Sequence, residues 1–142
     1  MISYDPNNVF AKILRGEFPC FKIYEDDRAF AFLDIMPRAT GHTLVIPKAP
    51  VRNILDIAPD DLAHVAKVAQ KIAKAGVKAF GADGVTLLQF TEPAGGQVVF
   101  HLHIHVIPRR DKVDLRPPES YKASPAELAE HALKLAKAVI EV

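Results

Sequence analysis

The stretch HLHIHVI, residues 101–107, constrains the fold of this chain more than any other part of the sequence. It holds three of the six histidines, and one apolar residue separates each of them from the next. Successive side chains of a β-strand point to opposite faces, so His101, His103 and His105 would share one face of a strand. The apolar residues between them would point the other way, into a core. The pattern therefore predicts a strand that is buried on one face and carries imidazoles on the other.

Length and composition narrow the class of protein. A chain of 142 residues can bury the core of a single domain. The formal net charge of +1, with both signs mixed along the chain, gives no indication of a nucleic-acid groove or a polybasic membrane patch. We find neither an apolar run of membrane-spanning length nor a secretory leader. Because the single cysteine, Cys20, cannot form an internal disulfide, we expect a cytoplasmic protein.

Hydrophobic periodicity and turn residues divide the chain into short strands and helices. Strands are predicted at 21–26, 28–34, 42–47, 84–90 and 98–108. Helices are predicted at 7–16, 59–80 and 125–142, and the polar, proline-rich segment 109–124 should be a loop. Strands joined by tight turns or by one long helix predict an antiparallel sheet with helices packed beside it, which is an α+β fold.

The histidine row has three interpretations: solvent-facing polar residues, a metal site or a catalytic site. Histidines two apart on a strand can chelate zinc, but no fourth ligand or carboxylate cluster lies nearby in the sequence. A neutral imidazole is a nucleophile near pH 7 when neighbours orient it. Gly95 and Gly96, just before the row, let backbone amides approach an anion and favour phosphate chemistry over a plain turn. His64 and His131, in predicted helices, should be solvated.

Residues 101–107 match the His-φ-His-φ-His-φ-φ signature of the histidine triad (HIT) family, in which φ is apolar. GHTLVIPK at 41–48 is similar to an earlier motif of that family, and the resemblance covers about residues 8–110. It implies a single HIT domain over residues 1–142, with a C-terminal loop and helix at 111–142. The implied HIT fold has a five-stranded antiparallel sheet with helices packed on it, and two sheets join into a ten-stranded sheet in a homodimer.

The third position of the signature is a histidine, His105. In this the chain resembles the Hint-like branch of the family, because the diadenosine-polyphosphate hydrolase branch has glutamine at that position. The resemblance implies a nucleotide-binding hydrolase or nucleotidyl transferase that cleaves P–N or P–O bonds at the α-phosphate. The implied substrates are nucleoside 5′-phosphoramidates or related nucleotide esters, with purine (AMP-type) nucleotides preferred. Their hydrolysis would form a covalent nucleotidyl-histidine and then release a nucleoside monophosphate. No metal or other cofactor is implied. The alternatives are a dinucleoside polyphosphate hydrolase, a non-catalytic purine-nucleotide-binding regulatory protein and a metal-binding protein.

The resemblance assigns catalytic roles to four histidines. His103 matches the nucleophile, and His105 matches the histidine near the leaving group, to which we assign proton transfer. His101 matches the residue whose backbone carbonyl fixes the tautomer of the nucleophile, and His42 matches a fourth, supporting histidine. An oriented imidazole, a proton donor and anion-stabilising amides are also what phosphoryl transfer requires on chemical grounds.

The same resemblance predicts where a nucleotide binds. Asp34 falls where the family holds the ribose hydroxyls. The other predicted nucleotide-binding residues are Phe32 and Ile35 at the base, Gly95, Gly96 and Gln97 at the phosphate, and Phe90.

The chain departs from the family pattern at three places. Asn8 and Ala11 stand where many relatives carry the Cys-x-x-Cys of a structural zinc site, so we expect no zinc of that kind. Phe90 and Thr91 occupy the stretch in which relatives often carry a nucleotide-contacting asparagine. Val98 stands where some relatives have a hydroxyl residue that contacts phosphate.

Overall fold

The computed structural model describes residues 2–142, which form an α+β fold with a five-stranded antiparallel sheet of order β1-β2-β3-β5-β4. The strands are β1 (Lys22–Glu25), β2 (Ala29–Leu33), β3 (Thr43–Pro47), β4 (Gly84–Leu88) and β5 (Ile104–Arg109). The helices are α1 (Val9–Leu14), α2 (Pro59–Phe80) and α3 (Pro125–Ile140), with the 3₁₀ turn η1 (Pro93–Gly95). The predicted fold class is confirmed, and each predicted strand and helix is present.

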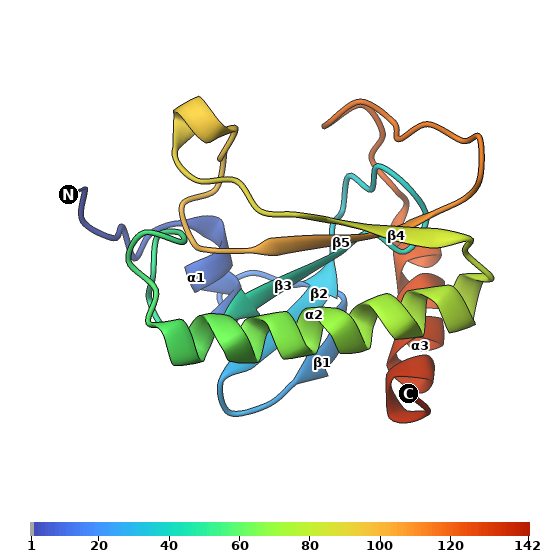
Figure 1. Cartoon of the computed structure of the whole chain (residues 1–142), viewed down its shortest axis with the longest axis horizontal. Coiled ribbons are helices and arrows are strands. Elements are labelled where there is room, and N and C mark those ends of the chain that lie inside the picture. Colours follow the sequence, from blue (N-terminus) through green and yellow to red (C-terminus); the bar gives the residue numbers. More distant parts are fainter. Residues whose placement is uncertain (1) are drawn as a thin grey trace.

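Buried side chains fill both faces of the sheet. The larger cluster joins one face to α2 and α3, for example through Val106, Ile72 and Leu135. Phe10 of α1 and Phe32 of β2 belong to a second cluster, formed by alternate side chains of the same strands. Figure 1 shows the long α2 running along the sheet and α3 standing near the end of α2. The side of the sheet that α2 and α3 leave uncovered is where the histidines lie.

The prediction for the last strand is wrong in its first half, since β5 begins at Ile104 rather than at residue 98. The partner strand β3 ends in Pro47, which has no amide hydrogen to continue the ladder. The Leu102 amide donates instead to the carbonyl of Val51, at 3.0 Å. Side chains still alternate through this irregular segment, because Leu102 is fully buried in the α2/α3 cluster while its neighbours point away from it.

The ends of the helices follow local rules. Asn8 caps α1 by accepting the Ala11 amide at 2.9 Å, so the two positions at which relatives carry cysteines are joined by a helix cap. Helix α2 begins with Pro59 and ends at Gly81, whose φ of 60° is left-handed. Ser124 caps α3 as predicted.

The segment between β5 and α3 has no helix or strand and passes over the loop that precedes β3. The Arg116 amide donates to the carbonyl of Arg38 at 2.9 Å, and the Ala123 amide donates to the carbonyl of Ile35 at 3.1 Å. These bonds tie the C-terminal loop to the residues that lead into His42. None of the helices within residues 2–142 combines the length and the apolar character needed to cross a membrane.

Candidate active site

Strand pairing brings four of the histidines together. His105 lies opposite Leu44 in the β3–β5 ladder, and His42 directly precedes β3. The rings of His103 and His105 have centroids 5.0 Å apart, and those of His42 and His105 are 5.1 Å apart. The structure thus gathers His42 and the three triad positions, although only His105 lies within a strand.

Hydrogen bonds determine which nitrogen of His103 carries its proton. The Nδ1 atom lies 2.7 Å from the carbonyl oxygen of His101, and a carbonyl can only accept. Nδ1 is therefore protonated, and the Nε2 atom of the neutral ring has a free lone pair. Burial lowers the pKa of His103, which keeps the ring neutral near pH 7.

His101 is held at both ring nitrogens. Its Nε2–H donates to the carbonyl of Pro47 at 2.8 Å, which leaves Nδ1 to accept the hydroxyl of Tyr4 at 2.6 Å. The side chain is fully buried, and burial lowers its pKa to about 4. Tyr4 thereby fixes the residue whose carbonyl holds His103. Sequence reasoning missed Tyr4, since nothing near it in the chain points to residue 101.

Hydrogen bonds also determine which nitrogen carries the proton in His42 and in His105. The Arg38 amide donates to Nδ1 of His42 at 3.1 Å, so the proton of the neutral His42 ring is on Nε2. That proton is donated to Nδ1 of His105 at 2.9 Å, which places the His105 proton on Nε2. Burial lowers the pKa of His42 to about 4 and that of His105 to about 3. Neighbouring rings therefore expose one bare Nε2, on His103, and one protonated Nε2, on His105.

Asp34 lies beside this pair. One of its oxygens is 3.7 Å from Nε2 of His42, and the other accepts the Met36 amide at 2.8 Å. Burial raises the pKa of the carboxyl. Asp34 follows directly on β2, and its own amide donates to the carbonyl of His42 at 3.0 Å, so a backbone bond also holds the two together.

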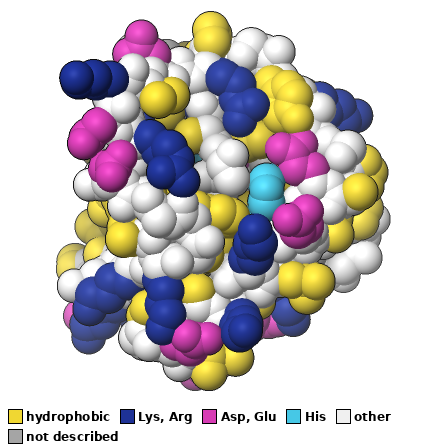
Figure 2. Space-filling model, turned by 90° about the vertical axis from the view of Figure 1, so that its right-hand side faces the viewer, with side chains coloured by type: hydrophobic (Ala, Val, Ile, Leu, Met, Phe, Trp, Pro, Cys, Tyr) yellow, Lys and Arg dark blue, Asp and Glu magenta, His cyan; other side chains and the backbone are white. Residues whose placement is uncertain are grey.

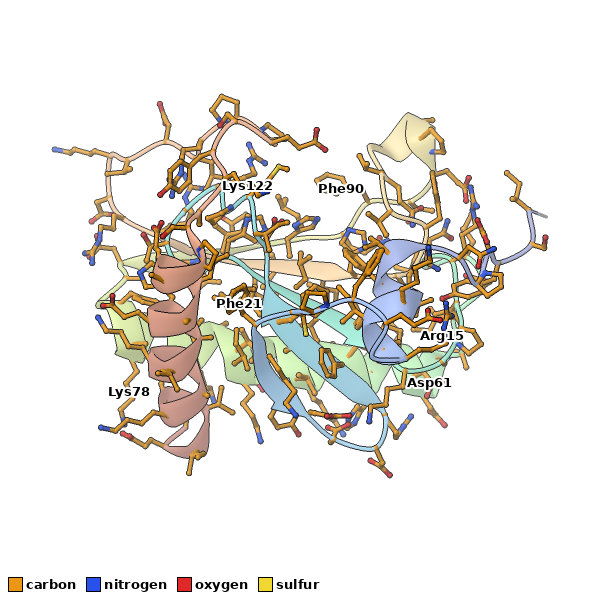
Figure 3. All side chains as sticks on the ribbon, turned by 180° about the vertical axis from the view of Figure 1, so that it is seen from behind. Arg15, Phe21, Asp61, Lys78, Phe90 and Lys122 are labelled. Atoms are coloured by element: carbon orange, nitrogen blue, oxygen red, sulfur yellow. The ribbon has the colours of Figure 1, made fainter. Side chains whose placement is uncertain are left out.

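Three phenylalanine rings lie around the histidine cluster. Phe10, which sequence reasoning missed, meets the His103 ring edge-on with centroids 4.9 Å apart. Phe32 packs against Phe10 and is only 3% exposed, whereas Ile35 is 47% exposed. Phe90 meets the His105 ring edge-on at 5.5 Å, and Figure 3 shows it between η1 and the loop that leads to α3. Phe10 and Phe90 thus border the two central rings from different elements.

A buried polar network anchors the loop that precedes the histidine row. Arg52 binds both carboxylate oxygens of Glu92, at 2.6 and 2.9 Å, and Asn53 donates to the same carboxylate. Arg52 also lies over the Phe100 ring, 4.1 Å from its centroid. Glu92 has a φ of 63°, which non-glycine residues rarely adopt. The network therefore holds a strained turn that no local sequence signal indicated.

Gln97, Gly95 and Gly96 form hydrogen bonds within this loop and with its neighbours. The Gln97 side chain is buried, accepts bonds from Asn53 and from the Glu92 amide, and donates to two backbone carbonyls. The amides of Gly95 and Gln97 donate to the Glu92 carbonyl, and the Gly96 amide donates to Pro93. The Gly95 and Gly96 amides and the Gln97 residue, which were expected at a phosphate, thus have internal partners here. The physical reason is the tight turn of η1, which closes these bonds before the chain reaches the histidines.

Histidines outside the cluster are not solvated as expected. His64 of α2 is half-buried, and its Nε2 lies 2.8 Å from a carboxylate oxygen of Asp26 in the β1–β2 turn. His131 of α3 is also half-buried and meets the Phe80 ring edge-on at 5.4 Å. Both side chains join elements that are distant in the sequence, which the helical pattern alone could not reveal.

A metal could be held by Asp34, His42 and His105, whose ligand atoms lie within 4.8 Å of one another. Carboxylate and imidazole groups are ligands that zinc accepts. However, the hydrogen bond between His42 and His105 already uses two of these atoms, so a metal would have to displace its proton. Within the described residues, this is the only such group, and it does not include His101 or His103.

Comparison with known proteins places this site in a family. The model of the HIT domain matches residues 15–112. The chain is 43% identical over 129 residues to a protein of Arabidopsis thaliana named adenylylsulfatase HINT3. That match covers 91% of this chain but only 62% of the Arabidopsis protein. The chain is also 40% identical over 108 residues to Protein hit of Bacillus subtilis, covering 76% of this chain and 74% of that protein.

Solved structures agree with this match over nearly the whole chain. A Hit-like protein of Bartonella henselae, described as involved in cell-cycle regulation and as having an unknown ligand, is 50% identical with a TM-score of 0.93. The alignment covers 96% of this chain and 99% of that one. A zinc-bound histidine triad protein of Mycobacterium smegmatis is 37% identical with a TM-score of 0.85, covering 95% and 94%. With more than half of its length matched by the family model, this chain belongs to the HIT domain family.

Proposed function

We propose that this chain binds a purine nucleotide of the AMP type and hydrolyses nucleoside 5′-phosphoramidates or related nucleotide esters through a covalent intermediate on His103. One observation carries the proposal, namely the opposite protonation of two adjacent Nε2 atoms. The bare Nε2 of His103 suits a nucleophile, and the protonated Nε2 of His105 suits a proton donor. Membership of the HIT family supports the same chemistry.

In the first step, Nε2 of His103 forms a bond to the α-phosphorus while the P–N or P–O bond to the leaving group breaks. The Nε2–H of His105 donates a hydrogen bond to the leaving atom, and a proton from solvent reaches that atom through this group, so the His105 ring stays neutral. The positive charge that the His103 ring gains is stabilised at its Nδ1–H by the carbonyl of His101. In the second step, water attacks phosphorus, the bond to His103 breaks, and the proton of the attacking water is released to solvent. The products are the leaving group and a nucleoside monophosphate.

Other residues bind the nucleotide in this proposal. Asp34 accepts the ribose hydroxyls, and Phe32, Ile35 and Phe90 border the base. Because their amides are already engaged, Gly95, Gly96 and Gln97 act on the phosphate by shaping the loop rather than by direct donation. The reaction uses no metal and no other cofactor.

We further propose that residues 1–142 act as one HIT domain of the Hint-like branch that pairs into a homodimer. Strands β1 and β4 are the two edges of the sheet, and an edge-to-edge pair would give ten strands. Leu87 on β4 is 52% exposed, which supports an association through that strand. A mass from light scattering equal to twice the chain mass is expected, and a monomer at micromolar concentration would refute the pairing.

A second leaving group is favoured by one comparison. The Arabidopsis relative is named an adenylylsulfatase, and this chain aligns with it over 91% of its own length. Sulfate could leave the α-phosphate of adenylyl sulfate by the same two steps, through P–O cleavage. A substrate series of adenosine phosphoramidate, adenylyl sulfate and a diadenosine polyphosphate would rank the leaving groups by kcat/KM.

The decisive experiment is mass spectrometry of protein quenched seconds after mixing with adenosine 5′-phosphoramidate, with AMP release followed in parallel. We expect a nucleotidyl adduct on His103 together with released AMP. His103→Ala should form no adduct, whereas the matched variant His64→Ala, outside the cluster, should react normally. An adduct on another residue would overturn the assigned nucleophile. AMP binding without adduct or turnover would favour the non-catalytic regulatory alternative.

A further inference from the structure

The seven arginines of the chain fall into two groups. Arg15, Arg28 and Arg52 each form an ion pair with a carboxylate, at 2.8, 2.9 and 2.6 Å. Within residues 2–142, no carboxylate lies within ion-pairing distance of the other four. These four are Arg38, Arg109, Arg110 and Arg116.

All four unpaired arginines line one cavity of about 640 Å³. It lies between the end of α2, the end of β5, the C-terminal loop and α3, and none of its lining residues belongs to the histidine cluster. Lys134, which lies 3.6 Å from a carboxylate oxygen of Glu130, adds a fifth cation, and Asp114 is the only carboxylate among the lining residues. Figure 2 faces this end of the molecule and shows Lys and Arg side chains around a histidine, with acidic side chains beside it.

The arginines are held in place without being neutralised. Arg109 donates to the hydroxyl of Thr86 at 3.0 Å, and Arg38 donates to the carbonyl of Arg116 at 2.8 Å. Arg110 donates to carbonyls at the end of α2. Arg116 stacks over the Tyr121 ring, 4.3 Å from its centroid. Neutral acceptors and an aromatic face orient these guanidinium groups but leave their charges uncompensated.

Gly41 allows two walls of this cavity to pack closely against each other. Its φ of +86° is left-handed, and a Cβ at this position would lie 2.6 Å from the Phe80 ring. The loop that carries Arg38 therefore packs directly against the end of α2. Like-charged side chains repel one another, so gathering four arginines without carboxylate partners around one cavity has an energetic cost that an anion would remove.

We propose that this cavity binds a phosphorylated small molecule that carries at least two phosphate groups, at a site separate from the histidine cluster. Guanidinium groups offer paired donors that match phosphate oxygens, and several of them favour a multiply charged ligand. Arg38 connects the site to the histidines, because its side chain lines the cavity while its amide donates to His42. The cavity is also large enough for a ligand of metabolite size.

Calorimetric titration of the full chain tests this site with three probes: inorganic tripolyphosphate, fructose 1,6-bisphosphate and citrate. We expect one equivalent of a phosphate probe to bind, and citrate to bind more weakly. Tripolyphosphate alone would indicate a free polyphosphate, and binding of the bisphosphate would indicate a phosphorylated metabolite. Failure of both phosphates to bind at 1 mM, or citrate binding as tightly as both, would overturn the proposal.

Charge-matched variants locate the site. Arg116→Gln should weaken phosphate binding about tenfold, since its charge-assisted bonds are lost. Arg28→Gln removes the same charge from the Asp61 pair outside the cavity and should change binding less than twofold. If Arg116→Gln does not fold, Lys134→Gln, on the exposed side of α3, serves as a second variant of the cavity. Equal losses in the cavity variants and the Arg28 control would show general charge attraction and refute the site. His103→Ala should bind the probe normally, so the result is independent of the proposed reaction.

Discussion

The histidine cluster and the arginine cavity lie on either side of the loop that carries Arg38, and they are organised in opposite ways. Each of the four clustered imidazoles is hydrogen-bonded within the chain; His42, His101 and His103 are buried and His105 is half-buried, and removal from water keeps each ring uncharged. The four arginines of the cavity, by contrast, have no carboxylate within ion-pairing distance among the described residues. The first region is therefore arranged completely by folding, whereas the second keeps a charge that only a ligand can neutralise.

The largest expected effect separates the two regions by function. His103→Ala should lower kcat by at least about 1000-fold, because the nucleophile is removed and the remaining histidines cannot replace it. Phosphate binding in the arginine cavity should be unchanged in this variant. Steady-state AMP release measures the first effect, and calorimetry measures the second. A loss of less than tenfold in kcat would contradict the covalent step.

Acid should destabilise the protein through the neutral cluster. Unfolded histidines take up protons near pH 6.5, whereas His42, His101 and His105 resist protonation down to about pH 4, 4 and 3 in the folded state. The unfolded state therefore binds more protons between these values, and folding stability falls as the pH drops through this window. Each of the three contributes up to about 1.4 kcal/mol per pH unit.

Urea denaturation at several values between pH 7.5 and pH 5 would measure this slope. His105→Gln should reduce the slope by the share of one histidine, because glutamine does not titrate. An unfolding free energy that stays constant across this range would show that the imidazoles are not held neutral by the fold.

A smaller effect is expected from the hydroxyl at the end of the hydrogen-bond chain. Tyr4→Phe leaves Nδ1 of His101 without its donor, so the carbonyl that holds His103 is less well fixed. We expect kcat to fall about fivefold with little change in KM, and stability to fall by about 1 kcal/mol. Tyr121→Phe is the matched control, since its hydroxyl bonds Glu127 at the surface. A change in KM alone would contradict the positioning role of Tyr4.

Salt should affect the two regions differently. The smallest effect we expect is the change in kcat, which depends on the histidine cluster. Raising NaCl from 50 to 500 mM should alter kcat by less than about twofold, because the reacting imidazoles are uncharged. The same change should weaken phosphate binding in the cavity about tenfold, since that binding depends on charge. Parallel kinetics and calorimetry on one preparation test the contrast. Equal sensitivity of kcat and cavity binding would contradict it.

Much of the fold follows from local patterns. The limits predicted for α2, Pro59 and Phe80, agree with the structure, because proline, acidic residues and Gly81 act on their own helix ends. The alternation around His103 correctly separated an apolar face from the face that carries the imidazoles. It could not reveal that residues 98–103 leave the ladder, since that depends on Pro47 in another strand.

Residues that support the site were beyond the reach of pattern. Tyr4 lies 97 positions before His101, and Arg52 lies 40 positions before Glu92. Gln97 was expected to face a phosphate, yet its side chain is taken up by the loop network. Short-range spacing identifies which chemistry is present but not which distant group orients it.

The sequence by itself determined the α+β class, the limits of α2 and the alternation of His101, His103 and His105, because period and turn chemistry act over a few residues. His42 was assigned only by the resemblance to the HIT family. Only the tertiary structure decided the tautomers of His103 and His105, since each depends on a hydrogen-bond partner brought from elsewhere in the chain. It also decided which arginines are paired with carboxylates, because a partner such as Asp61 of Arg28 lies 33 positions away in the chain. Packing selects such partners over long separations, and no local pattern encodes that choice.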